Sequence, residues 1–159
     1  MTLIVQNTID PSLFATLATT QGSQTVANKT LKAVKEPVTI ANAAPTSTTN
    51  FDVATQSIVV YNQATTNFTL NVRGGENQTF NSMLAAGESI TINLFVPNGT
   101  TAYYPSTIMI DGNVISPKYQ GGIAYTSGNS NSIDLYVLFI IKTSTSPTYQ
   151  VYMSQTKFA

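Results

Sequence analysis

The stretch NFTLNVRGG, residues 67–75, decides the fold class because its side chains alternate between apolar and polar. Phe68, Leu70 and Val72 point to one side of an extended chain, and the polar residues between them point to the other. The stretch ESITINLFVPNG, residues 88–99, repeats this alternation and ends in a Pro-Asn-Gly turn. Both stretches therefore predict β-strands that bury one face.

Similar strand patterns extend on both sides of these two stretches. They are FDVATQSIVVYN (51–62), AYYPSTIMID (102–111), SIDLYVLFIIKT (132–143) and TYQVYMSQTKFA (148–159). Asp111-Gly112 lies between two apolar runs, which predicts a hairpin turn. Residues 132–143 are apolar on both faces, which predicts a central strand covered on both sides. Only NSMLAAG, residues 81–87, has a helical turn pattern, with Asn81 or Ser82 as N-cap and Gly87 as its stop. We expect an all-β fold, an antiparallel β-sandwich of jelly-roll-like type.

The amino-terminal third differs from the rest in composition. We expect residues 1–49 to form an extended arm and connector, with one short strand at Val38–Ala41, and residues 50–159 to form the β-sandwich domain. Large apolar residues are sparse in the connector, so it cannot bury enough surface to fold alone. The arm carries six apolar residues that we expect to serve in attachment or oligomerisation. These are Leu3, Ile4, Val5, Leu13, Phe14 and Leu17.

Composition narrows the choice of partners. Hydrophobic residues make up 42% of the chain and charged residues only 9%, with a formal net charge of zero. No basic patch is present, which argues against a nucleic-acid partner, and near-neutral surfaces favour self-association. No run reaches the roughly 18 apolar residues of a membrane span, so we expect no membrane insertion, and the amino terminus lacks the features of a secretion signal.

Residue types also weigh against catalysis. The chain has no histidine and no cysteine, which removes the commonest general base and the usual nucleophile pairs. A carboxylate pair could still hydrolyse glycosidic bonds, and Asp111 and Asp134 are the acids whose mutation would test this remote alternative. No cofactor motif and no acidic metal-binding loop is present. We predict that the protein is not an enzyme and holds no cofactor.

One segment gathers residues suited to surface recognition. They are Tyr104, Lys118, Tyr119, Gln120 and Tyr125. Exposed tyrosine rings stack on sugar rings, and a glutamine amide binds sugar hydroxyls, so the group could recognise a glycan. The alternative is that tyrosines are good strand formers and that these are packing residues.

Blocks of the sequence resemble a known family. They include KEPVTI, NFTLNVRGG, NSMLAAGESITI, NGTTAYYPSTIMIDGNVISPKYQGG and SQTKFA, and SQTVANKTLKAV precedes them. Together, over about residues 22–159, they resemble the carboxy-terminal domain of tail-fibre-like virion proteins from tailed phages of marine cyanobacteria and related hosts. One departure is Tyr119, where the family pattern has tryptophan.

The resemblance implies a non-enzymatic phage structural protein on the surface of the virion, assembled as a homotrimer. About 50 residues precede the expected domain, too few for a long stalk. We therefore expect a short fibre or knob, or a capsid decoration protein, that is attached to capsid or tail through its amino-terminal arm. The alternative is a carbohydrate-binding module that recognises a glycan of the host surface.

Overall fold

The structure is a computed structural model that describes residues 35–146 and 148–159. Within these residues, Glu36–Ala159 belong to one compact unit. Its strands are β1 (Val38–Ile40), β2 (Thr48–Asp52), β3 (Ile58–Val60), β4 (Phe68–Arg73), β5 (Ser89–Asn98), β6 (Pro105–Ile110), β7 (Asn113–Ile115), β8 (Lys118–Tyr119), β9 (Ser132–Ser144) and β10 (Thr148–Phe158). The helical elements are α2 (Phe80–Met83) and a short 3₁₀ turn, η1 (Gln120–Gly122). The prediction of an all-β fold is confirmed.

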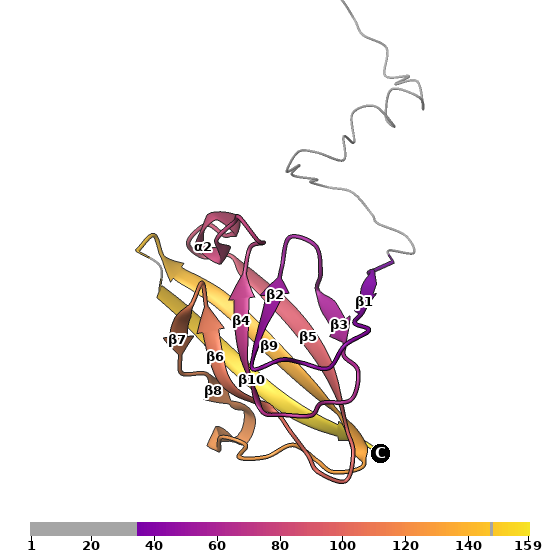
Figure 1. Ribbon diagram of the computed structural model, residues 1–159. Coiled ribbons are helices and arrows are strands. Elements are labelled where there is room, and N and C mark those ends of the chain that lie inside the picture. Colours follow the sequence, from indigo (N-terminus) through magenta and orange to yellow (C-terminus); the bar gives the residue numbers. More distant parts are fainter. Residues whose placement is uncertain (1–34, 147) are drawn as a thin grey trace, which may run out of the picture. The chain divides into compact units, whose positions relative to one another are not determined.

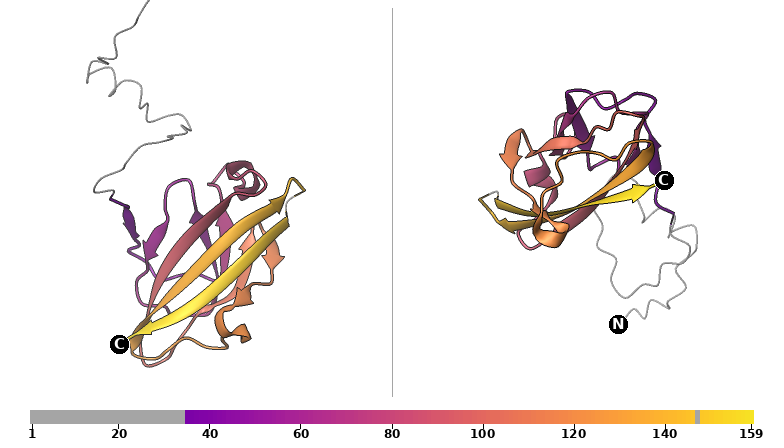
Figure 2. Two further views of the ribbon diagram at one scale, coloured as in Figure 1. Left: turned by 180° about the vertical axis from the view of Figure 1, so that it is seen from behind. Right: turned by 90° about the horizontal axis from the view of Figure 1, so that it is seen from below.

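The strands form two sheets, which Figures 1 and 2 show from three sides. Sheet A has the strand order β1-β3-β5-β9-β10-β8, and sheet B has the order β2-β4-β6-β7. The prediction of antiparallel sheets is wrong, because five of the eight strand pairings are parallel and both sheets are mixed.

The parallel pairings follow from the path of the chain. From β1 to β6 each strand lies in the other sheet from the one before it. A chain that leaves a sheet, crosses to the other and returns can lay its next strand parallel to the last. The tight turn at Asp111-Gly112 instead gives the antiparallel β6–β7 hairpin, as predicted, with positive φ angles of 49° and 78°.

One hydrophobic core is shared by the two sheets. Sheet B contributes the alternating residues of β4, and Phe68, Leu70 and Val72 are at most 1% exposed. Sheet A contributes the inner faces of β5, β9 and β10, with Leu94 and Tyr136 fully buried. The predicted alternation in β4 and β5 is therefore confirmed.

Other details differ from expectation. The compact unit starts at Glu36, and the expected strand in the connector is β1, which pairs with β3. Residues 36–49 thus belong to the folded unit, whereas residues 1–34, with all six apolar arm residues, lie outside the described residues. The N-cap of α2 is Thr79, whose hydroxyl accepts a hydrogen bond from the Ser82 backbone at 3.3 Å, so the predicted caps at Asn81 or Ser82 are wrong.

Candidate functional site

The outer face of sheet A is unusually apolar. Along β9, alternate residues Tyr136, Leu138 and Ile140 fill the core, so Leu135 and Val137 point to the outside. The outward apolar residues of sheet A are hereafter called the apolar face. They are Val38, Ile40, Ile58, Val60, Phe95, Pro97, Ile133, Leu135, Val137, Phe139, Ile141, Tyr152 and Phe158. Figure 2 (left) shows the long strands β5, β9 and β10 on this side of the domain.

Strand register makes these residues neighbours. Leu135 pairs with Phe95 on one side and with Thr156 on the other. Phe139 pairs with Tyr152, and their ring centroids lie 6.4 Å apart. Directly paired residues on one face of a sheet touch each other. The apolar face is therefore continuous from β1 to β10.

The described residues leave much of this face open to solvent. Among the described residues, eight large apolar side chains are exposed, and six of them belong to the apolar face. Those six are Val38, Ile40, Ile133, Phe139, Tyr152 and Phe158. Ile133 and Phe139 are each 40% exposed. Among the described residues only the inner side of β9 is covered, and the cover of its second side stays a prediction.

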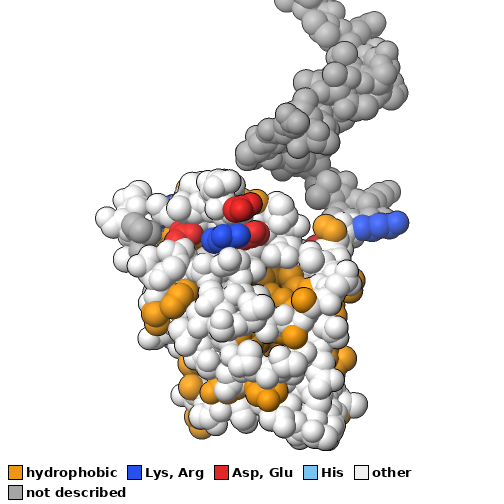
Figure 3. Space-filling view, viewed as in Figure 1, with side chains coloured by type: hydrophobic (Ala, Val, Ile, Leu, Met, Phe, Trp, Pro, Cys, Tyr) orange, Lys and Arg blue, Asp and Glu red, His pale blue; other side chains and the backbone are white. Residues whose placement is uncertain are grey.

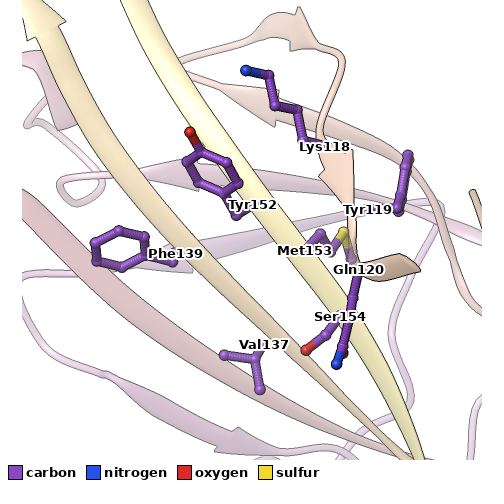
Figure 4. Close-up of a pocket in the computed structure, with 8 residues that line it drawn as sticks. All are labelled: Lys118, Tyr119, Gln120, Val137, Phe139, Tyr152, Met153 and Ser154. Atoms are coloured by element: carbon purple, nitrogen blue, oxygen red, sulfur yellow. The ribbon is translucent and has the colours of Figure 1, made fainter. Parts of the chain in front are cut away.

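A groove of about 310 Å³ opens where the apolar face meets the edge strand β8 (Figure 4). Lys118, Tyr119 and Gln120 line its edge, and Phe139 and Tyr152 line the side that belongs to the apolar face. The Lys118 ammonium lies 5.6 Å from the centre of the Tyr152 ring, within range of a cation–π interaction. Three of the five predicted recognition residues therefore share one groove.

Tyr104 and Tyr125 occupy a different environment. Tyr125 lies at the centre of a tyrosine cluster, with ring centroids 5.7 Å from Tyr104, 5.2 Å from Tyr119 and 5.3 Å from Tyr136. Its hydroxyl donates to the Met153 sulfur at 2.8 Å. Burial raises the pKa of the Tyr125 hydroxyl, and the neighbouring tyrosines add to the shift. The cluster favours the packing interpretation for Tyr104 and Tyr125.

Tyr119 takes part in both environments. Its ring contacts Tyr125, and it also lines the groove and a second hollow of about 300 Å³ beside η1. The β8 strand that carries it pairs in parallel with β10, which places Tyr119 next to Met153. Aromatic character at this position thus serves packing as well as the groove wall.

Sequence reasoning missed the groove residues contributed by β9 and β10. Phe139 and Tyr152 come from segments recognised only as strands. The stretch SIDLYVLFIIKT, residues 132–143, could have indicated them, because its second apolar face is expected to pack against something. The described residues do not supply that cover.

The two carboxylates of the hydrolase alternative hold separate parts of the structure. Asp134 is fully buried and accepts hydrogen bonds from the Asn98 amide at 3.1 Å, the Asn129 backbone at 2.8 Å and the Gln155 amide at 3.3 Å. Asp111 accepts hydrogen bonds from backbone groups of α2. Both carboxylates accept hydrogen bonds from uncharged groups. These bonds hold neighbouring segments in place, which is a structural role.

Two further features bear on function. Among residues 35–146 and 148–159, no group of three or more acidic, histidine or cysteine residues is placed to hold a metal ion. In that same part of the chain, no helix has the length and apolar character that crossing a bilayer requires. When the chain is compared with protein families, with curated proteins and with solved structures, it matches none of them.

Proposed function

We propose that the protein is a structural component of a phage particle, a short fibre or knob or a capsid decoration protein, exposed on the virion surface. It is not an enzyme and assembles with copies of itself, as a homotrimer, through the apolar face. The family resemblance of the sequence supports the virion setting and the trimer. The apolar face supports the assembly, and it is the observation that carries the proposal.

The physical case rests on how soluble proteins treat apolar surface. A single domain rarely leaves a large continuous apolar area exposed unless something covers it. Lys118 is the one charged side chain among the outward positions of the described strands of sheet A, and it lies at the edge. Copies of such a face meet without charge repulsion, which suits a symmetric assembly.

Attachment to the particle is assigned to the amino-terminal segment. Its apolar residues Leu3, Ile4, Val5, Leu13, Phe14 and Leu17 supply the side chains that dock on a capsid or tail protein. The jelly-roll-like sandwich, as a finer description of two sheets that share one core, stays a prediction within this proposal.

Deletion of residues 1–21 tests the attachment. We expect the truncated protein to be lost from purified particles, measured by immunoblot, while the recombinant form still melts cooperatively. A companion variant in which Leu13, Phe14 and Leu17 are changed to serine should behave in the same way. Undiminished incorporation of the truncated protein would contradict the proposed attachment.

Glycan binding at the groove is the second candidate, and one observation favours it. The rings of Tyr119 and Tyr152 line the same groove as the amide of Gln120. Binding of host polysaccharide on a glycan array, lost in Tyr119→Ala and Gln120→Ala, would favour this candidate. The groove opens onto the apolar face, so assembly through that face would cover part of it, and we therefore place assembly first.

A further inference from the structure

A separate pocket of about 530 Å³ is lined by residues of α2, the β6–β7 turn and the start of β10. Figure 1 shows where these elements lie in the domain. The polar wall of the pocket includes Asn81, Asp111 and Asn113, and its apolar wall includes Ile110, Ile115 and Tyr149. The volume falls within the range of small-molecule sites, roughly 300–1,000 Å³. None of these residues belongs to the apolar face or to the groove at β8.

The carboxylate on the pocket wall is held in place by the fold. Asp111 occupies the first position of the β6–β7 turn with a φ of 49°, and Gly112 follows it. The Asp111 Oδ1 accepts a hydrogen bond from the Phe80 backbone at 2.7 Å, and Oδ2 accepts one from the Asn81 backbone at 3.0 Å. Each carboxylate oxygen has two lone pairs, so both oxygens keep acceptor capacity for a ligand.

Two neighbouring polar atoms are left without partners. Within the described residues, the buried side-chain atoms that make no hydrogen bond are the Asn81 Oδ1 and the Tyr149 hydroxyl. Both residues line this one pocket. Native proteins pair nearly all buried polar groups, so unpaired groups that share one pocket wall indicate a missing partner. Burial and then the negative charge of Asp111 raise the pKa of Tyr149, so its hydroxyl keeps its proton to donate.

We propose that this pocket binds a neutral sugar residue. The sugar hydroxyls donate to Asp111. A small movement of the pocket wall on binding exposes the buried Asn81 Oδ1, which then accepts from the sugar, and the buried Tyr149 hydroxyl, which then donates to it. The apolar face of the sugar ring lies against Tyr149 and Ile115.

The wall chemistry selects this class of ligand. Asp111 is the one charged residue among those that line the pocket. The Lys142 ammonium lies behind the wall, where it donates to the backbone carbonyls of Asn81 at 2.8 Å and Leu84 at 2.7 Å and is thus already engaged. The other polar groups that line the pocket are amides and hydroxyls, which match a ligand with many hydroxyl groups. A sugar offers several donors together with an apolar ring face, and the pocket presents acceptors beside an aromatic ring.

The site does not depend on the proposed assembly, because every residue that forms it comes from one chain and lies away from the apolar face. Failure of sugar binding would leave the proposed structural role untouched. Conversely, a monomeric protein could still bind a sugar here.

The test is a ¹H–¹⁵N NMR titration of the full chain with glucose, galactose, mannose and N-acetylglucosamine, each up to about 50 mM. We expect at least one of them to shift the amide signals of α2, the β6–β7 turn and the start of β10, with a dissociation constant of about 1–10 mM.

Tyr149→Phe is the diagnostic variant, and Tyr103→Phe, in the loop between β5 and β6 and outside both the pocket and the groove, is its matched control. We expect Tyr149→Phe to weaken binding by about tenfold and Tyr103→Phe to bind within about twofold of the parent. Without sugar, Tyr149→Phe should melt at the same temperature or higher, because it removes a buried hydroxyl that has no partner. If Tyr149→Phe does not fold, Asn81→Ala takes its place, because it removes the Asn81 Oδ1 acceptor, and it should also weaken binding.

Three results would overturn the proposal. They are an absence of shifts with all four sugars, shifts confined to another surface, and equal weakening by Tyr149→Phe and Tyr103→Phe. An ethylamine titration is the last arm, because a cation would also be drawn to Asp111. Tighter binding of ethylamine than of any sugar would assign the pocket to cations instead.

Discussion

The two outer faces of the domain are built from the same strand geometry and differ in what covers them. On sheet B the outward residues are mostly Thr and Asn, and the Asn71 amide donates to the Asn50 side chain at 2.9 Å while its oxygen accepts from the Gly112 backbone at 2.9 Å. Arg73 pairs with Asp52 in the neighbouring strand. On sheet A most of the corresponding positions are apolar and make up the apolar face. Figure 3, which views the sheet B side, is largely white with its charged side chains toward one end.

The contrast shows that the low charge of this chain has two different consequences. On sheet B, uncharged polar side chains such as Asn71 bond to each other and to the backbone, so most of that face is polar among the described residues. On sheet A, the same alternation carries apolar residues on both sides of β9, so one side buries in the core and the other remains to be covered. Sheet B is thus suited to face solvent, and sheet A to face a copy.

The largest expected effect comes from placing one charge on each face. Leu135→Glu puts a carboxylate in the middle of the apolar face, and burying it unpaired in an assembly is very costly. We expect assembly to weaken by more than about 1,000-fold, which is about 4 kcal/mol. Sedimentation velocity measures this. Thr69→Glu, on the outer face of sheet B, is the matched control and should assemble as the parent does. Equal dissociation by both variants would remove the contrast between the faces.

Alkaline pH should act through the tyrosines, which among the described strands belong to sheet A. Burial raises the pKa of Tyr61, beside β3, to about 12, and it also raises the pKa of Tyr136 in β9. A folded pKa above the unfolded value near 10 gives stability that is complete below pH 10 and is lost as pH rises from there. At pH 11 the expected loss is about 1.4 kcal/mol for each of these tyrosines.

Urea unfolding at pH 8, 10 and 11 checks the alkaline prediction. Tyr61→Phe removes one titrating group and should flatten the decline. A free energy of unfolding that is constant up to pH 11 would show that the buried tyrosines do not resist ionisation.

The next largest effect is expected on the free energy of unfolding, from one alanine substitution on each face. Asn71→Ala removes both hydrogen bonds of Asn71 and should lower the free energy of unfolding by about 1–2 kcal/mol. Asn93→Ala is the same change on the outer side of sheet A, where the Asn93 side chain makes no hydrogen bond to other described residues. Urea unfolding of both variants, made in the Leu135→Glu background, should show a loss only for Asn71→Ala. A loss for Asn93→Ala of the same size would contradict the division between the faces.

The ion pair on sheet B should contribute least. The Arg73 Nε lies 2.5 Å from the Asp52 Oδ1, and both side chains are about one quarter exposed, at 26% and 27%. The hydrogen bond to Asp52 is the main cause of the raised pKa of Arg73. Solvent-exposed pairs contribute little and are screened by salt. We expect Asp52→Asn to lower the melting temperature slightly in low salt and not at all in high salt. A loss that persists in high salt would indicate a contribution from packing.

Local patterns predicted the elements well and their arrangement poorly. Sequence patterns predicted the alternation in β4 and β5 and the Asp-Gly turn of the β6–β7 hairpin, because both depend on residues that are neighbours in the chain. Strand direction depends on whether a connection turns back or crosses to the other sheet. The crossings between β1 and β6 carry no residue signature that differs from an ordinary loop, so the parallel pairings were missed.

The same limit applies to the sites. Lys118, Tyr119 and Gln120 are consecutive, and their gathering at one groove could be predicted. Phe139 and Tyr152 reach that groove through the register of β9 and β10, which only the paired strands reveal. Asp111 was correctly assigned to a turn, but its bonds to α2 join residues 30 and 31 positions apart, and no local pattern encodes them.

The central claim is that copies of this chain cover the apolar face, and the mass of the full protein in solution tests it most directly. Light scattering after gel filtration should give three chains of 17.0 kDa each over a range of concentrations. The mass of a single chain at every concentration, with the apolar face left open to solvent, would contradict the claim.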